Sequence, residues 1–123
     1  MKRSALQTLP NGFGYARGNI AVAVAELATG PGDVRRRLGD VYDRWLHVLV
    51  AADFPIALRS RFTEIERALT RYEPDELSKR FGRTAVQETL RRIHNSTGSK
   101  IAKMLVELSD EMNTLWEQSL SAA

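Results

Sequence analysis

The sequence predicts an all-α protein, an irregular bundle of five or six helices in a single domain. Apolar residues recur at spacings of three and four over most of the chain, which is the period of one face of an α-helix. Residues that favour helix N-termini precede several of these stretches. The chain has 123 residues, of which 43% are hydrophobic and 27% charged. This is the length and composition of one globular domain with its own core.

The N-terminal segment differs from the rest of the chain. Residues 1–18 contain Pro10 and several glycines and lack helical periodicity. This composition predicts an irregular N-terminal arm. The helical domain is therefore expected to span residues 19–120.

The first expected helix follows this arm. Asn19 is a suitable N-cap for a short, largely buried helix that extends to about Ala28 and ends at Gly30-Pro31-Gly32. The run 20–27 also alternates like a β-strand. Its alanines favour a helix, and no partner strand is visible elsewhere in the sequence.

Two apolar stripes predict the central helices. Asp33 is expected to cap a helix that runs to about Ala52, and Pro55 to open a helix that ends before Pro74. A short helical turn is expected over residues 75–81, closed by a glycine. The apolar positions are Val34, Leu38, Val41, Tyr42, Trp45, Leu46 and Leu49 in the first stripe and Leu58, Phe62, Ile65, Leu69 and Tyr72 in the second.

The longest stripe covers the C-terminal part of the chain. Thr84 followed by Gln87 forms the pattern of a capping box. Residues 95–99 look like a break, yet the phase of the apolar positions continues through them. One long bent helix and two nearly collinear helices therefore both fit residues 84–118. The stripe consists of Val86, Leu90, Ile93, Thr97, Ile101, Leu105, Leu108, Met112 and Leu115.

The charges are distributed unevenly along the chain. The formal net charge is +3, from 18 Lys and Arg against 15 Asp and Glu. Residues 104–123 contain acidic but no basic residues, so the rest of the chain is basic and the C-terminal part acidic. Cysteine is absent, which excludes disulfides and sulfur-based zinc sites and favours a reducing cytoplasm. We expect a cytoplasmic protein without membrane contact.

The sequence shows no combination of residues typical of catalysis, cofactor binding or metal binding, so we expect no enzyme. His47 is expected on a charged, solvated helix face beside a ladder formed by Arg36, Asp40 and Arg44. His94 is expected to be half-buried beside the last apolar stripe. Zinc requires three or four converging ligands, and the two histidines lack such partners.

The segment Ser96–Lys100 resembles the end of a phosphate-binding loop. The first glycine of that motif and the strand that precedes it are both missing. A helix restart, or close helix packing at Gly98, is the expected role of this segment.

Arginine is the strongest functional signal, because its planar fork suits phosphate and carboxylate partners. Three arginines fall in the first turn of a predicted helix, where the helix dipole disfavours cations, so we expect compensation from outside that helix. An ordinary solvated surface, a docking site for a protein and a nucleic-acid site all fit the arginines. The interleaved acids and few exposed aromatics favour protein over nucleic acid. The candidate partner-binding residues are Arg35, Arg36, Arg37, Arg91, Arg92, Lys100 and Lys103.

Three segments carry a resemblance to known proteins: residues 25–38, 53–58 and 95–102. They are similar to parts of small helical proteins of bacterial phages and mobile elements. The resemblance implies a non-enzymatic binder that blocks or adjusts a host complex, as anti-CRISPR proteins do. It implies no catalytic residues.

Two functions from different classes follow. The first is a non-enzymatic interaction protein of a phage or mobile element that binds a larger host assembly, such as a CRISPR-type defence complex. The alternative is a basic nucleic-acid-binding helical protein, comparable to a small subunit of a ribonucleoprotein complex. The long C-terminal stripe also offers a seam for a homodimer.

Overall fold

The computed structural model describes residues 9–122, and this part of the chain contains helices and no strand. The prediction of an all-α bundle in a single domain is confirmed. A π-helical turn, η1 (Tyr42–Leu46), and a 3₁₀ turn, η2 (Ala51–Asp53), lie between α3 and α4. The six α-helices are α2 (Phe13–Thr29), α3 (Val34–Val41), α4 (Ile56–Leu69), α5 (Glu76–Arg80), α6 (Ala85–Arg92) and α7 (Asn95–Ala122).

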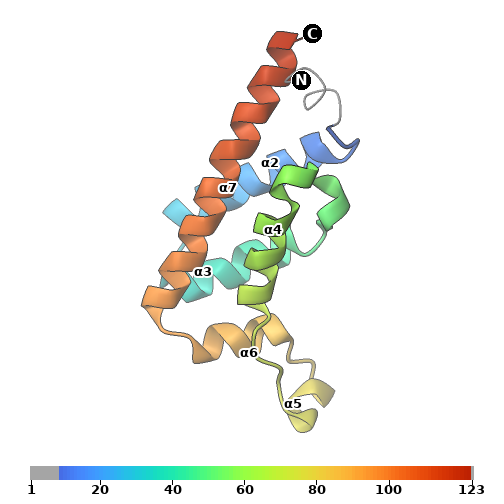
Figure 1. Cartoon of the computed structure of the whole chain (residues 1–123). Coiled ribbons are helices and arrows are strands. Elements are labelled where there is room, and N and C mark those ends of the chain that lie inside the picture. The colour runs from blue at the N-terminus through green and yellow to red at the C-terminus, as the bar shows by residue number, and fades with distance from the viewer. Residues whose placement is uncertain (1–8, 123) are drawn as a thin grey trace.

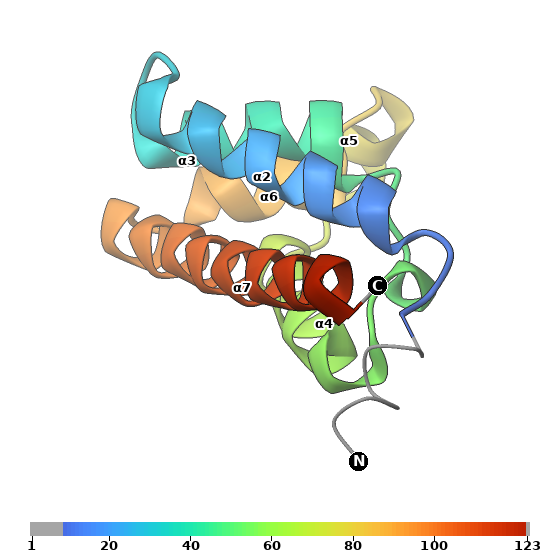
Figure 2. The same ribbon diagram turned by 90° about the horizontal axis from the view of Figure 1, so that it is seen from above.

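The long helix α7 organises the bundle. It runs along the length of the molecule and packs against α2, α3 and α4 (Figure 1). Seen from above, α2 and α3 form a layer on one side of α7, and α4 lies on another side (Figure 2). Helix α6 crosses the end of the bundle opposite to the C-terminal end of α7 and contacts α3 and α4. Helix α5 projects beyond α6 and has few contacts with the other helices.

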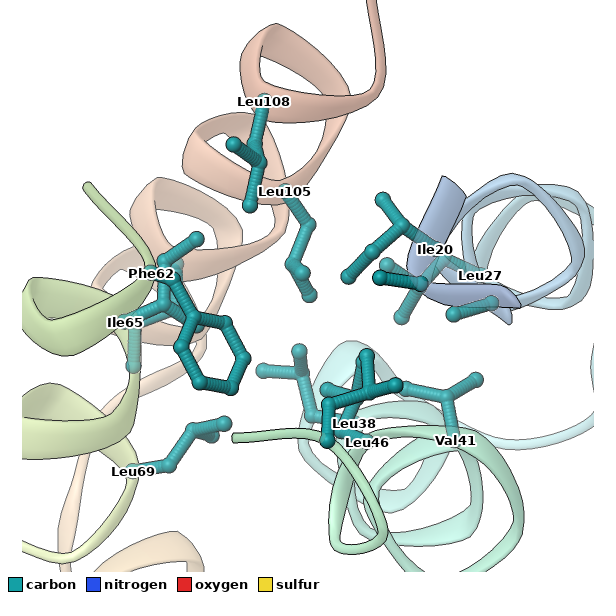
Figure 3. Close-up of a cluster of buried hydrophobic side chains, with 14 of the residues drawn as sticks. Ile20, Leu27, Leu38, Val41, Leu46, Phe62, Ile65, Leu69, Leu105 and Leu108 are labelled. Carbon is teal, nitrogen blue, oxygen red and sulfur yellow. The ribbon is translucent and has the colours of Figure 1, made fainter. Parts of the chain in front are cut away.

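The core lies where α2, α3, α4 and α7 converge. Side chains from all four helices point into one space in Figure 3. The expected apolar stripes supply most of these side chains, so the prediction of a shared core is confirmed. The labelled members are Ile20, Leu27, Leu38, Val41, Leu46, Phe62, Ile65, Leu69, Leu105 and Leu108.

Two expected helix caps form. Asp33 Oδ1 accepts a hydrogen bond from the backbone N–H of Arg36 at 3.0 Å, at the start of α3. Thr84 and Gln87 bond each other's backbone N–H groups at the start of α6, as a capping box requires. These bonds satisfy N–H groups that have no partner within the helix.

The N-terminal boundary of the helical domain was predicted wrongly. Helix α2 begins at Phe13 rather than after Asn19, so part of the expected irregular arm is helical; its first eight residues lie outside the described ones. Phe13 is buried and its ring packs against Trp116 of α7, which extends the helix beyond its local signals. The Asn19 side chain donates to the Trp45 carbonyl instead of capping a helix. One face of α2 is buried rather than most of the helix.

The helix predicted from Asp33 to about Ala52 is also shorter than expected. It ends as α3 at Val41 and continues as the π-helical turn, in which the His47 N–H bonds the Tyr42 carbonyl five residues earlier. The wider turn changes which side chains face the core. Tyr42 and Trp45, both expected in the core, are half-buried and pack against its edge.

The last predicted stripe divides into two helices that are not collinear. The break falls at Ile93, whose ψ of 156° is extended, and α7 leaves α6 at a sharp angle (Figure 1). His94 lies at this corner and is exposed, not half-buried as predicted. Gly98 is packed closely against α3: a Cβ there would lie 3.0 Å from Val34 Cγ1. The expectation of close helix packing at Gly98 is confirmed.

Candidate interaction surface

The fold brings some of the predicted arginines together. Arg35 and Arg36 of α3 and Arg91 of α6 line one shallow groove between the two helices. Arg83, just before α6, lines the same groove. We call this groove the α3–α6 groove, and its lining residues are Asp33, Arg35, Arg36, Gly39, Arg83, Gln87, Leu90 and Arg91.

A second hollow adjoins the α3–α6 groove. It lies between α5 and the start of α6, and it shares Arg83 and Gln87 with the groove. The two hollows therefore form one continuous surface, which we call the α5–α6 surface. The lining residues of the second hollow are Leu77, Ser78, Phe81, Gly82, Arg83 and Gln87.

A buried carboxylate orders the arginines around α6. The Glu88 side chain is 3% exposed, and its Oε2 lies 2.6 Å from Arg91 Nη2 and 2.5 Å from Arg92 Nε. Arg83 Nε lies 4.0 Å from the other carboxylate oxygen. Hydrogen bonds from Arg91 and Arg92 hold the pKa of Glu88 below its ordinary value. Three guanidinium groups thus surround Glu88, and Asp75 also interacts electrostatically with Arg83 and Arg91, so the three arginines exceed the two acids by one charge.

Stacking and hydrogen bonds fix the neighbourhood of this cluster further. Arg92 Cζ lies 5.1 Å from the centre of the Tyr72 ring, a favourable position for a cation over an aromatic face. The backbone N–H of Tyr72 donates to Thr89 Oγ1 at 2.9 Å, which joins the segment after α4 to α6. Arg92 is therefore held toward Tyr72 and is absent from the lining of the α3–α6 groove.

Two of the three consecutive arginines of α3 act inside the fold. Arg37 donates from Nη1 to the Leu27 carbonyl at 2.7 Å and from Nε to the Gly32 carbonyl at 3.0 Å. Arg35 Nη1 donates to the Ile93 carbonyl at 3.2 Å. Leu27 lies in the last turn of α2 and Ile93 ends α6, so both carbonyls belong to the negative ends of helix dipoles. These carbonyls supply the compensation expected from outside the helix.

Arg36 differs from its two neighbours. Its side chain is exposed, and within residues 9–122 its guanidinium forms no ion pair. Lys100 and Lys103 are exposed on α7, and neither lines the α3–α6 groove. The seven predicted partner-binding residues therefore divide between internal roles and several surfaces.

The α5 hollow carries exposed apolar side chains that the sequence analysis did not select. Phe81 is 84% exposed and Leu77 is 65% exposed. Leu77 lies in α5, Phe81 is the C-cap of that helix, and Gly82 follows with a φ of 85°, which favours glycine. An aromatic residue in a short helix outside every apolar stripe is the signal that could have identified this position.

Both histidines are exposed. His47 is exposed, as expected, and its Nδ1 lies 3.2 Å from the Tyr42 carbonyl oxygen. The expected ladder of Arg36, Asp40 and Arg44 does not form among the described residues, and Arg44 Nη1 instead lies 3.6 Å from Glu26 Oε2. Across residues 9–122, no cluster of three or more His, Cys, Asp or Glu side chains has the arrangement of a metal site.

The chain matches no protein-family model, no curated protein and no solved structure with which it was compared. Among the described helices, none has the length and apolar character needed to span a membrane.

Proposed function

We propose that this chain is a non-enzymatic interaction protein that binds a protein partner through the α5–α6 surface. The observation that carries the proposal is the exposure of Phe81 and Leu77 beside arginines ordered around Glu88. Aromatic and arginine side chains are the types most enriched among residues that dominate binding energy in protein interfaces. Their combination on one surface supports protein docking.

The arginine cluster also favours tight recognition for an entropic reason. Immobilising a flexible side chain on binding costs free energy. Arg91 is already bonded to Glu88, while its side chain is still 59% exposed. A partner that contacts Arg91 therefore meets a guanidinium whose position is largely set.

The resemblance to phage and mobile-element proteins suggests the setting of this interaction. We propose a bacterial host assembly as the partner and inhibition of a host-defence complex, such as a CRISPR-type complex, as the result. A stoichiometric binder needs no catalytic residue for such inhibition. The cytoplasm is the compartment that fits this partner.

Nucleic-acid binding is the second candidate function. It is supported by the gathering of Arg35, Arg36, Arg83 and Arg91 in one groove. Each phosphate contact would add about 0.9 to the slope of log affinity against log salt. Phe81 is an aromatic ring on which an unpaired base can stack, but the aliphatic Leu77 beside it has no such partner in a nucleic acid, and this favours a protein.

Affinity capture with matched variants tests the proposal. Immobilised wild-type protein, Phe81→Ser, Arg36→Glu and the control Arg67→Glu are each incubated with nuclease-treated bacterial lysate. We expect one protein assembly to be retained by the wild type and the control and lost by the other two variants. The captured assembly is then purified and its affinity for the four proteins measured. A parallel incubation with untreated lysate is the comparison: an assembly retained from the untreated lysate but not from the treated one would instead support nucleic-acid binding.

A further inference from the structure

We infer that the α5–α6 surface binds an acidic segment of a partner protein that also carries a large apolar side chain. The inference deepens the proposed function and rests on it, because it specifies the chemistry of the partner. Two adjoining features carry it: the net positive charge of the α3–α6 groove and the exposed side chains of Leu77 and Phe81 at the hollow beside α5.

Among the described residues the groove keeps a net positive charge, because its four arginines outnumber the three nearby acids Asp33, Glu88 and Asp75. Its exposed acid is Asp33, which is committed to Arg35 at 3.1 Å and to the start of α3. Glu88 and Asp75 are the other acids near Arg83 and Arg91. Arg36 adds a further positive charge. Partner carboxylates would complement this excess.

The guanidinium groups retain donors for such carboxylates. A guanidinium has five N–H donors in a planar fork that fits a carboxylate with two parallel bonds. Arg91 bonds Glu88 through Nη2, and Arg83 is no closer than 4.0 Å to it. The side chains of Arg91 and Arg83 are 59% and 39% exposed. Both can therefore bind a second carboxylate without releasing the first.

The exposed apolar side chains at the α5 hollow distinguish an acidic protein segment from other anions. Leu77 and Phe81 face solvent, and covering them would remove apolar area from water. Because Arg83 and Gln87 line both hollows, one short segment can place an apolar side chain against Phe81 and its carboxylates in the groove. Inorganic phosphate and nucleic-acid backbones would use only the charged half of this surface.

A second copy of this chain is the competing occupant. The C-terminal part of α7 is acidic, and its Leu120 is 62% exposed. It therefore has the same general chemistry as the inferred partner segment. Such a contact would be head to tail, because α5 and the C-terminal end of α7 lie at opposite ends of the molecule (Figure 1).

Fluorescence anisotropy with designed peptides tests the inference. The probe is a labelled helical peptide with four glutamates and a Leu-Phe pair on one face. One control peptide replaces the glutamates with glutamine, and another replaces Leu and Phe with serine. We expect each control peptide to bind at least about tenfold more weakly, which corresponds to about 1.4 kcal/mol. Equal binding of the glutamine peptide would overturn the inference.

Matched protein variants locate the binding site. Phe81→Ser and Arg36→Glu change exposed side chains outside the core, and Arg67→Glu makes the same charge change on α4. We expect the first two variants to weaken the acidic peptide about tenfold and the third to leave it nearly unchanged. Circular dichroism melts verify that all three variants are folded. A loss of the same size in Arg67→Glu would show nonspecific charge attraction and overturn the inference.

Two further measurements test the other candidate occupants, a general polyanion and a second copy of this chain. Heparin that binds more tightly than the peptide, with no effect of Phe81→Ser, would show a general polyanion site and overturn the inference. Analytical ultracentrifugation showing self-association that Phe81→Ser abolishes would assign the surface to a second copy and overturn it as well. A partner captured from lysate could lose binding to Phe81→Ser and yet bind equally well after its own acidic residues are substituted. That result would refute the inferred chemistry and leave the proposed function standing.

Discussion

The arginines of α3 and those around α6 lie side by side but are used differently. Arg35 and Arg37 donate to backbone carbonyls at the ends of neighbouring helices. Arg91 and Arg92 share one buried carboxylate with Arg83 nearby. In the first group the partners are carbonyls that hold helices together, and Arg35 is also paired with Asp33. In the second group the shared partner is the Glu88 carboxylate, whose single negative charge does not balance the three arginines around it.

This difference shows that a run of arginines is not by itself a binding site. The distinction lies in what the donors contact and in how much charge is left over. By this criterion Arg37 is a structural residue and Arg91 is both ordered and accessible. Substitutions of these residues test the difference between structural and accessible arginines. The largest effect is expected at Leu90, which joins the two groups.

Leu90 joins α6 to α3 and lies between the two arginine groups. It is 8% exposed, and its Cδ1 approaches Gly39 of α3. We expect Leu90→Ala to lower the free energy of unfolding by about 2–5 kcal/mol, because it removes buried methyl groups and leaves a cavity. Urea denaturation measures the change, with the exposed Leu77→Ala as the control. A loss in Leu90→Ala no greater than that of the control would show that α6 is held by its charges alone.

Arg37 should contribute more to stability than its neighbour Arg36. Arg37→Ala removes two charge-assisted hydrogen bonds to carbonyls at the end of α2 and in the turn after it. We expect a loss of about 1.5–3 kcal/mol, the range for hydrogen bonds to charged groups. Arg36→Ala is the matched control on the same helix and should change stability by less than about 0.5 kcal/mol. Equal losses in thermal and urea unfolding would contradict the internal role of Arg37.

The Glu88 cluster should make the protein sensitive to acid. Arg91 and Arg92 lower the pKa of Glu88 in the folded protein, so this carboxylate stabilises the fold above its unfolded pKa of about 4.3. That contribution is lost as the pH falls through the folded pKa. We expect Glu88→Gln to be less stable than the wild type at neutral pH and to lose less stability between neutral and acidic pH.

The acid measurement needs a correction for two helix caps. Backbone hydrogen bonds from Arg36 and Ser78 also lower the pKa values of Asp33 and Asp75, so these residues give an acid dependence of the same sign. Urea unfolding of wild type and Glu88→Gln over a pH series isolates the Glu88 contribution as the difference. Parallel curves for the two proteins would show that Glu88 does not couple to the arginines.

The helices were predictable because their signals are local. The stripe through Phe62 and Leu69 and the caps at Asp33 and Thr84 lie within a few residues of the structure they specify. The start of α2 depends instead on a contact between Phe13 and Trp116, which are far apart in the sequence. Tertiary packing of this kind overrides local preference and cannot be read from spacing.

The candidate surface was only partly predictable for the same reason. Arg35, Arg36 and Arg91 were selected by residue type, and the fold brings them into one groove. The internal bonds of Arg37 depend on where α2 ends relative to α3, which no local pattern encodes. Phe81 was missed because a single aromatic outside a stripe carries no periodic signal, and its exposure becomes visible only in the fold.

Phe81 should show the smallest effect on stability and thereby separate binding from folding most clearly. Its side chain is 84% exposed, so Phe81→Ser removes little buried area and should change the free energy of unfolding by less than about 0.5 kcal/mol. Thermal melts and urea titrations measure that change, and Leu69→Ala, a fully buried position on α4, provides the large-effect reference. A substantial loss of stability in Phe81→Ser would mean that the ring packs against the chain in solution. The α5 hollow would then be part of the core, and the apolar half of the proposed docking surface would not exist.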